Sequence, residues 1–220
     1  MDNIVKVITG SQLHGLAGLE SDTDIRGIHI HSVKDILSPY KKIKNTSWIE
    51  GDVDNTSYEL SDFCKIATQG NPNILEVLFS DMIEEETDAY KEMRANRSAF
   101  LDSKRIYEAS KGYCHNQYKK MNLFEPDKRT PKFAVAYIRT LHQMAQLLRT
   151  GTFECRITGE LKDELRQIKY HYEEFDKKRL VQLFEEKMQG LNEAYCENHD
   201  RFTPDIEWIE DFIYRTYTNN

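Results

Sequence analysis

The sequence predicts an α+β fold, in which a small mixed-sheet core is followed by an α-helical bundle. Short β-branched runs separated by turn residues occupy residues 1–82, which we assign to an α/β core. In residues 83–220, which we assign to a helical C-terminal domain, apolar residues recur at helical spacing and strand signals nearly vanish. We find no internal repeat in either part.

The core is expected to begin with two strands. The run "NIVKVIT" over residues 3–9 ends at Gly10, as a strand ends at a turn. The stretch "DIRGIHIHS" over residues 24–32 alternates isoleucine with polar residues, which predicts a second strand with His29 and His31 exposed.

The next elements are weaker strands and then two helices. "TSWIEG" and "VDNTSYEL" suggest a hairpin that turns at residues 51–52. Ser61 is a candidate N-cap for a helix that Gly70 would end. Pro72 stands at a first-turn position of the following helix, "NPNILEVLFS".

Helical periodicity dominates the rest of the chain. Pro131 and Gly151 delimit the clearest helix, and "LFEPDKRT" before it carries turn residues that predict a loop. The other helical stretches are "TDAYKEMRANRSAFL", "SKRIYEASKGYCHNQYKKMN", "ELKDELRQIKY", "DKKRLVQLFEEKMQGLNEAYCEN" and "PDIEWIEDFIYRTY".

Composition restricts the function classes. The chain has 220 residues and a net charge of −7, which argues against a protein coated in nucleic acid. The N-terminus has neither the basic start nor the apolar run of a signal peptide, so we expect a cytoplasmic protein without a membrane span. The 4 cysteines have no CxxC spacing, which favours reduced, mostly buried thiols over a zinc site or disulfides.

The middle of the chain is basic despite the acidic total. From Lys104 to Arg149 there are ten lysines and arginines against three acids. A solvated helix face is one interpretation, and a surface facing phosphates is the other. Lys132 and Arg139 are seven residues apart and share a helix face; the other basic residues that could extend a site toward an acceptor are Lys119, Lys120, Lys128 and Arg129.

Two carboxylates stand two residues apart at the second predicted strand. Asp22 and Asp24 would point to the same face of a strand, where like charges are costly without a cation between them. Mg²⁺ is the natural partner, because it takes carboxylate oxygens and completes its octahedron with substrate phosphates. A solvated turn pair is the alternative.

A Gly-Ser pair upstream favours the metal interpretation. Gly10 and Ser11 follow the first strand and open "QLHGLAG", a possible short helix. Glycine lets the backbone approach a ligand, while helix-start N–H groups and a hydroxyl donate to phosphate. Phosphoryl or nucleotidyl transfer requires this combination of phosphate donors and metal-binding acids.

These residues resemble a known superfamily. "GSQLHGLAGLESDTDIRGIHI" is similar to the polymerase β-like nucleotidyltransferases, and most like a branch named for an RNA repair pathway (RlaP-like), found in bacteria and phages, that reads "GSxxxGLxxxxSDxDxRGI". A second block, "YELSDFCKIATQGNPNILEVLFS", resembles a later block of that branch. The two blocks cover about the first 80 residues, and "KFAVAYIRTLHQMAQLLRTGTF" matches the helical continuation only loosely.

The resemblance implies a third carboxylate on a later strand that completes a two-ion Mg²⁺ site, with Mn²⁺ as a possible substitute. Asp54 is the candidate, and Asp52 and Glu59 are the alternatives. The branch usually carries a basic residue where this chain has Asp62, and Lys65 could substitute for it.

Four further residues could contact the NTP. His14 could face the triphosphate or base, or be an exposed loop residue; Arg26 could contact a phosphate or form a structural ion pair. Tyr58 could stack on a base or belong to the core, and Asn71 could bind substrate or cap a helix.

The predicted function is metal-dependent transfer of a nucleoside monophosphate from an NTP such as ATP to an acceptor hydroxyl, with an RNA or tRNA end preferred. Gly10 and Ser11 would hold the β and γ phosphates, and the three aspartates would bind the metal. Adenylylation of a partner protein, as in antitoxin-like members, is an alternative. A catalytically inactive nucleotide-binding module and a metal-dependent phosphodiesterase are further alternatives.

Overall fold

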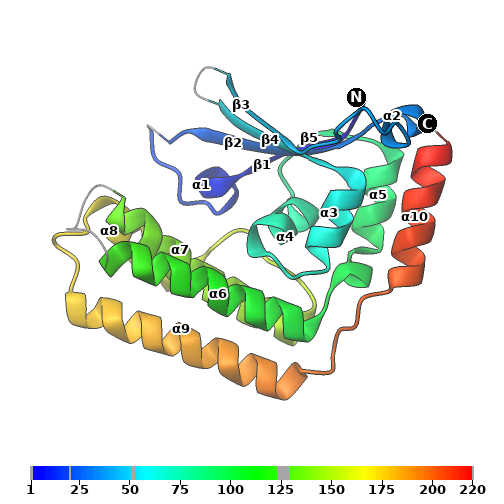
Figure 1. The fold of residues 1–220 in the computed structure, drawn as a ribbon. Coiled ribbons are helices and arrows are strands. Elements are labelled where there is room, and N and C mark those ends of the chain that lie inside the picture. Colours follow the sequence, from blue (N-terminus) through cyan, green and yellow to red (C-terminus); the bar gives the residue numbers. More distant parts are fainter. Residues whose placement is uncertain (1, 20, 51–52, 123–128, 220) are drawn as a thin grey trace.

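The computed structural model describes residues 2–19, 21–50, 53–122 and 129–219, and confirms an α+β fold. A five-stranded mixed sheet forms one layer, and helices cover one of its faces (Figure 1). The longest helices form a bundle beyond that layer, and the chain returns to the sheet side with its last helix (Figure 1).

The sheet joins parallel and antiparallel pairs. Its order is β3-β4-β2-β1-β5, in which β2 and β4 are parallel and the other pairs are antiparallel. The strands are β1 (Asp2–Thr9), β2 (Thr23–Ile30), β3 (Thr46–Glu50), β4 (Val53–Glu59) and β5 (Ile83–Glu86). The predicted first two strands and the β3–β4 pair are therefore confirmed, while the turn at residues 51–52 lies outside the described residues.

The fifth strand was not predicted. β5 reads "IEEE", has no apolar alternation, and pairs with β1 at the edge of the sheet. Because backbone hydrogen bonds rather than side-chain burial hold this edge strand, its sequence carries little strand signal. The strand lies directly after residue 82, so the sheet is completed by the first residues of the segment that we assigned to helices.

Short helices connect and cover the strands. They are α1 (Gly10–Leu13), α2 (Val33–Ile36), α3 (Leu60–Ala67), α4 (Pro72–Phe79), α5 (Asp88–Ala95) and the 3-10 turn η1 (Arg97–Phe100). The cap of α3 is Glu59 rather than Ser61, since the Glu59 carboxylate accepts from the backbone N–H groups of Ser61 and Asp62. Asn71 caps α4, with Pro72 in the first turn as predicted.

The bundle is built around α7. Helices α6 (Ser103–Asn122), α8 (Gly159–Tyr170) and α9 (Lys177–Asn198) pack against α7 (Thr130–Thr150). Gly151 ends α7 in the left-handed conformation, as its sequence predicts. The predicted loop before α7 falls largely on residues 123–128, which lie outside the described residues.

The last helix, α10 (Ile206–Thr218), packs beside the core rather than in the bundle (Figure 1). Arg215 of α10 donates to the Glu92 carboxylate of α5 at 2.8 Å. The two ends of the chain lie on the same side of the molecule (Figure 1).

His29 corrects one expectation of the alternation pattern. Its side chain is fully buried, and its Nδ1 lies 2.7 Å from the Ser57 hydroxyl. β2 is an interior strand with neighbours on both sides, so a polar residue on it is not exposed by alternation alone. Burial and the adjacent His31 lower the pKa of His29 to about 4.

The cysteines agree with the prediction of reduced thiols. All four cysteines are free, and only Cys196 is exposed. Within the described part of the chain, no helix combines the length and apolar character needed to span a membrane.

Candidate functional site

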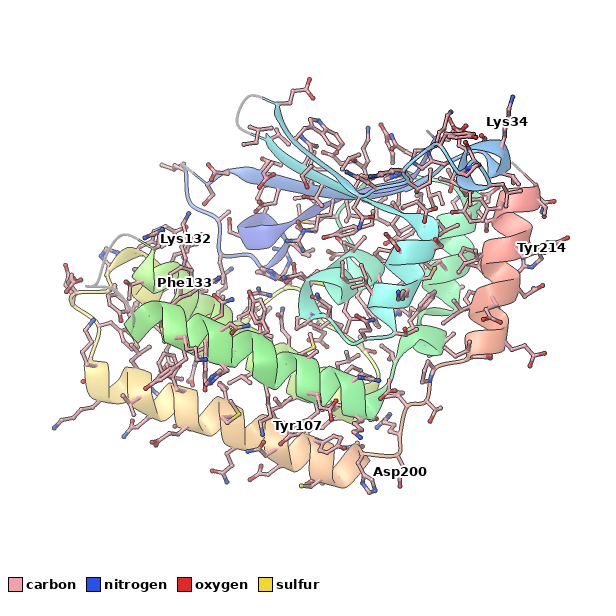
Figure 2. All side chains as sticks on the ribbon, viewed as in Figure 1. Lys34, Tyr107, Lys132, Phe133, Asp200 and Tyr214 are labelled. Carbon is pink, nitrogen blue, oxygen red and sulfur yellow. The ribbon has the colours of Figure 1, made fainter. Side chains whose placement is uncertain are left out.

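A cavity of about 850 Å³ lies where the sheet and α1 face helices α7 and α8. Figure 2 shows one of its lining residues, Lys132, near the start of α7 on the side toward the sheet. The polar and charged residues that line the cavity are Ser11, His14, Ser21, Asp22, Asp24, Arg26, Asn73, Glu76, Lys132, Arg139, Arg166, Lys169 and His171. Asp22 and Asp24 thus lie on the strand side, Glu76 comes from α4, and most of the cations come from the bundle.

The Gly-Ser turn lies directly against the second carboxylate. Gly10 has φ +64°, and a Cβ built on it would lie 2.0 Å from Oδ2 of Asp24. Only glycine permits both the backbone conformation and this close approach. Helix α1, which begins at Gly10, is only one helical turn long, so its macrodipole is small compared with that of a longer helix.

The three predicted aspartates are neighbours at one end of the sheet. Asp24 and Asp54 are directly paired across the parallel β2–β4 register and therefore face the same side, with Asp22 just before β2. Burial raises the pKa of Asp24, and the charges of Asp54 and Asp22 raise it further while Arg26 opposes them. Asp22 and Asp24 line the cavity, whereas Asp54 is exposed and is not among the lining residues.

The acids fit a divalent cation by their chemistry. Among the described residues, no three histidine, cysteine or acidic side chains are arranged closely enough to hold a metal ion. However, burial and, to a smaller extent, the charges of Asp54 and Asp22 raise the pKa of Asp24, and a cation bound by these carboxylate oxygens would stabilise its charged form. Asp22, Asp24 and Asp54 are the residues that would hold such an ion.

The alternatives to Asp54 differ in position. Glu59 is buried and occupied as the cap of α3, where it also accepts from the Tyr217 hydroxyl. Asp52 lies outside the described residues. Register therefore favours Asp54 over Glu59.

Helix α8 holds the connector between the Gly-Ser turn and the acids. The Leu16 carbonyl accepts from Lys169 Nζ at 2.9 Å and from the Tyr170 hydroxyl at 2.8 Å. Arg166 donates to the Ala17 carbonyl at 3.2 Å. A Cβ on Gly18 would lie 2.7 Å from the Tyr170 hydroxyl, so a larger residue there would require the Tyr170 side chain to shift. No motif in the α8 sequence predicts that this helix contributes to the site.

A buried ionic cluster lies at the inner end of the cavity. The Glu76 carboxylate accepts from Arg139 at 2.8 Å and lies 3.3 Å from His14 Nε2 and 3.7 Å from Arg26 Nη1. Burial by itself raises the pKa of Glu76, but the charges of His14, Arg139 and Arg26 outweigh it and hold the pKa well below its usual range. No local sequence pattern predicts these partners of Glu76, because they are distant in the chain.

His14 is buried rather than exposed. Its Nδ1 lies 2.9 Å from the Cys155 carbonyl, so it links the connector to the segment after α7. Burial and Arg139 lower the pKa of His14, although Glu76 opposes them.

Three predicted NTP contacts lie outside the cavity lining. Tyr58 packs against Phe63 in the core, Lys65 is exposed on α3, and Asn71 caps α4. Their local patterns are also those of ordinary core, surface and capping residues, which is how the structure uses them.

The basic residues in the middle of the chain, between Lys104 and Arg149, divide between the cavity and the surface. Lys132 and Arg139 both line the cavity, which confirms that they share a face of α7. Lys119 and Lys120 are exposed on α6 and Arg129 is exposed just before α7, while Lys128 lies outside the described residues.

A mixed sheet with Gly-Ser after its first strand and Asp-x-Asp at the next defines a nucleotidyltransferase-like core. Comparison with protein families agrees: the family described as RlaP, the RNA repair pathway DNA polymerase beta family, matches residues 3–215. The chain belongs to this family, and the match extends well beyond the blocks of the first 80 residues.

One curated relative is a phage protein without an assigned activity. The chain is 30% identical over 132 residues to an uncharacterized 38.9 kDa protein in the nrdC-mobD intergenic region of Enterobacteria phage T4. The match covers 54% of this chain and 39% of the relative's length.

Proposed function

We propose that the protein is a metal-dependent nucleotidyltransferase that transfers a nucleoside monophosphate from an NTP to an RNA or tRNA end and releases pyrophosphate. The observation that carries this proposal is the contact between the Gly10 turn and the Asp24 carboxylate, with Asp54 paired beside it. The Gly10 turn, which a phosphate could approach, thus meets the Asp24 carboxylate in the cavity, and Asp54 lies beside Asp24 in the sheet. Family membership supports the reaction class.

The charge distribution of the cavity supports an NTP as substrate. Asp22 and Asp24 lie on the strand side, and Lys132, Arg166 and Lys169 lie on the bundle side. Polyphosphate bound between them would contact the side-chain cations on one side and, on the other, a metal ion held by the carboxylates. A bound Mg²⁺ would neutralise phosphate charge and activate the acceptor hydroxyl.

Each residue of the candidate site has a defined role in this proposal. Ser11 donates from its hydroxyl to a β or γ phosphate, and Gly10 keeps that approach open. Asp22 and Asp24 orient the triphosphate through the cation, and Asp54 receives the proton of the attacking hydroxyl. Arg26 offsets part of the negative charge of Asp24.

The test is transfer of label from α-labelled NTPs with Mg²⁺ or Mn²⁺. Parallel reactions contain no acceptor, RNA ends, tRNA or candidate proteins. We expect label on RNA or tRNA in wild type and none in the Asp22→Asn/Asp24→Asn variant. Asp54→Asn separately tests the third acid and is expected to lower kcat at least 100-fold.

Asp200→Asn is the matched control, because Asp200 is an exposed acid near the end of α9, far from the cavity (Figure 2). Label on a polypeptide alone would replace the RNA acceptor by a protein acceptor. Release of nucleoside monophosphate without any acceptor would indicate a phosphodiesterase. No transfer together with no nucleotide-dependent thermal shift would refute the proposal.

A further inference from the structure

We propose that Arg26 and Arg139 form a phosphate-binding subsite at the inner end of the cavity, with Glu76 as its positioning residue. The identity of the ligand as a substrate phosphate rests on the function proposed above. The subsite joins three elements, because Arg26 is on β2, Glu76 on α4 and Arg139 on α7.

One carboxylate holds both guanidinium groups. Oε1 of Glu76 accepts from Nη1 of Arg139 at 2.8 Å, and Oε2 lies 3.7 Å from Nη1 of Arg26. The Arg139 Nη1 also donates to Gln143 at 2.8 Å, and the Arg26 Nη1 donates to the Asn73 carbonyl at 2.8 Å. Both arginines are thus oriented before any ligand binds.

Both arginines retain donors for a ligand. Across the described part of the chain, all hydrogen bonds of these two side chains use Nη1, so Nε and Nη2 are available. A guanidinium offers several donors in one plane, which suits two phosphate oxygens at once. Both side chains line the cavity, where such a ligand would enter.

The cluster has an excess of positive charge. Two guanidinium groups face the single carboxylate of Glu76, and the His14 ring beside it cannot offset the second guanidinium, because an imidazole is either neutral or positively charged. Asp24 offsets part of the Arg26 charge but is committed to a cation in the proposed function. An excess charge in a largely buried position is costly unless an anion accompanies it. Phosphate is the anion that the cavity is proposed to receive.

The experiment measures binding of two phosphate probes by calorimetry. Tripolyphosphate represents the NTP tail, and a 5′-hydroxyl RNA oligonucleotide represents the acceptor backbone. Each is titrated with Mg²⁺ and again with EDTA, so the result does not depend on transfer or on the metal. Arg139→Met and Arg26→Met are each expected to weaken binding about 10- to 100-fold, the loss of a charge-assisted hydrogen bond.

Arg179→Met is the matched control, since Arg179 is also ion-paired, with Glu164 and Glu186, but does not line the cavity. Arg139→Lys replaces Arg139→Met if the latter fails to fold, because it keeps the charge and removes the planar donor pair. A loss for tripolyphosphate alone assigns the subsite to the NTP tail; a loss for RNA alone assigns it to the acceptor. Binding within about twofold of wild type for both probes overturns the subsite.

Glu76→Gln separates positioning from charge. Removing the carboxylate raises the net positive charge, so a purely electrostatic role predicts tighter tripolyphosphate binding with unchanged kcat. A positioning role predicts at least a 10-fold loss of kcat while KM for the NTP is unchanged or lower. Glu76→Asp, which keeps the charge and shortens the side chain, should show the same loss. Unchanged kcat in both variants would refute the positioning role.

Discussion

Replacing Gly10 with alanine tests the contact on which the proposed site depends. Two effects follow from the structure: the residue has φ +64°, and the new Cβ would be built 2.0 Å from Oδ2 of Asp24. Since Cβ contacts under 3.0 Å essentially do not occur, the carboxylate must move by about 1 Å or more. The backbone conformation adds a strain of about 1–2 kcal/mol.

The two effects act on different observables. The strain is expected to lower the thermal midpoint by about 2–8 °C. The displaced carboxylate is expected to lower kcat/KM about 100-fold, because a misplacement of about 1 Å in a catalytic group can cost this much. Thermal unfolding and the NTP transfer assay measure them separately.

Gly159→Ala provides the matched control. Gly159 also has φ +64°, but a Cβ there meets nothing within 4 Å. It should therefore show a similar loss of stability with nearly full activity. If Gly10→Ala retains the activity of Gly159→Ala, the position of the Asp24 carboxylate does not matter for the reaction, and the reasoning fails.

Three further predictions concern charge and stability. Burial and the neighbouring acids raise the pKa of Asp24, so the folded protein loses stability as pH rises through that pKa. The Asp24→Asn variant should therefore have a higher melting temperature than wild type at pH 7 without divalent ions. Addition of Mg²⁺ should raise the melting temperature of wild type only. Arg139→Met leaves Glu76 buried without its nearest cation and should cost about 3–5 kcal/mol by urea unfolding; a loss below about 1 kcal/mol would contradict the cluster. His29 has a pKa of about 4 in the folded protein against 6.5 in the unfolded chain. Its contribution to the free energy of unfolding is therefore fully present above pH 6.5 and falls by at most about 3 kcal/mol as the pH drops toward 4. A His29→Gln variant with the same acid dependence as wild type would refute that assignment.

The sequence was sufficient to predict those elements whose start and end depend on residues close together in the chain. The β-branched run before Gly10 and the proline and glycine that bound α7 predict the observed elements, because turn and capping preferences act within a few residues. The spacing of Asp22 and Asp24 likewise predicts neighbouring carboxylates. The fifth strand was missed because edge pairing needs little from its side chains.

Which distant residues meet depends on how the elements pack and cannot be predicted from local sequence. The parallel register that sets Asp54 beside Asp24 depends on the crossover between β2 and β4, and no local pattern encodes it. The burial of Glu76 and its pairing with Arg139 depend on how α7 packs on the core. The Gly-Ser and Asp-x-Asp blocks were enough to predict the family, because their residue types and spacing are local features of the chain. The cavity, its cations and its buried carboxylate arise only when the bundle closes over the sheet, because they are contacts between segments far apart in the chain.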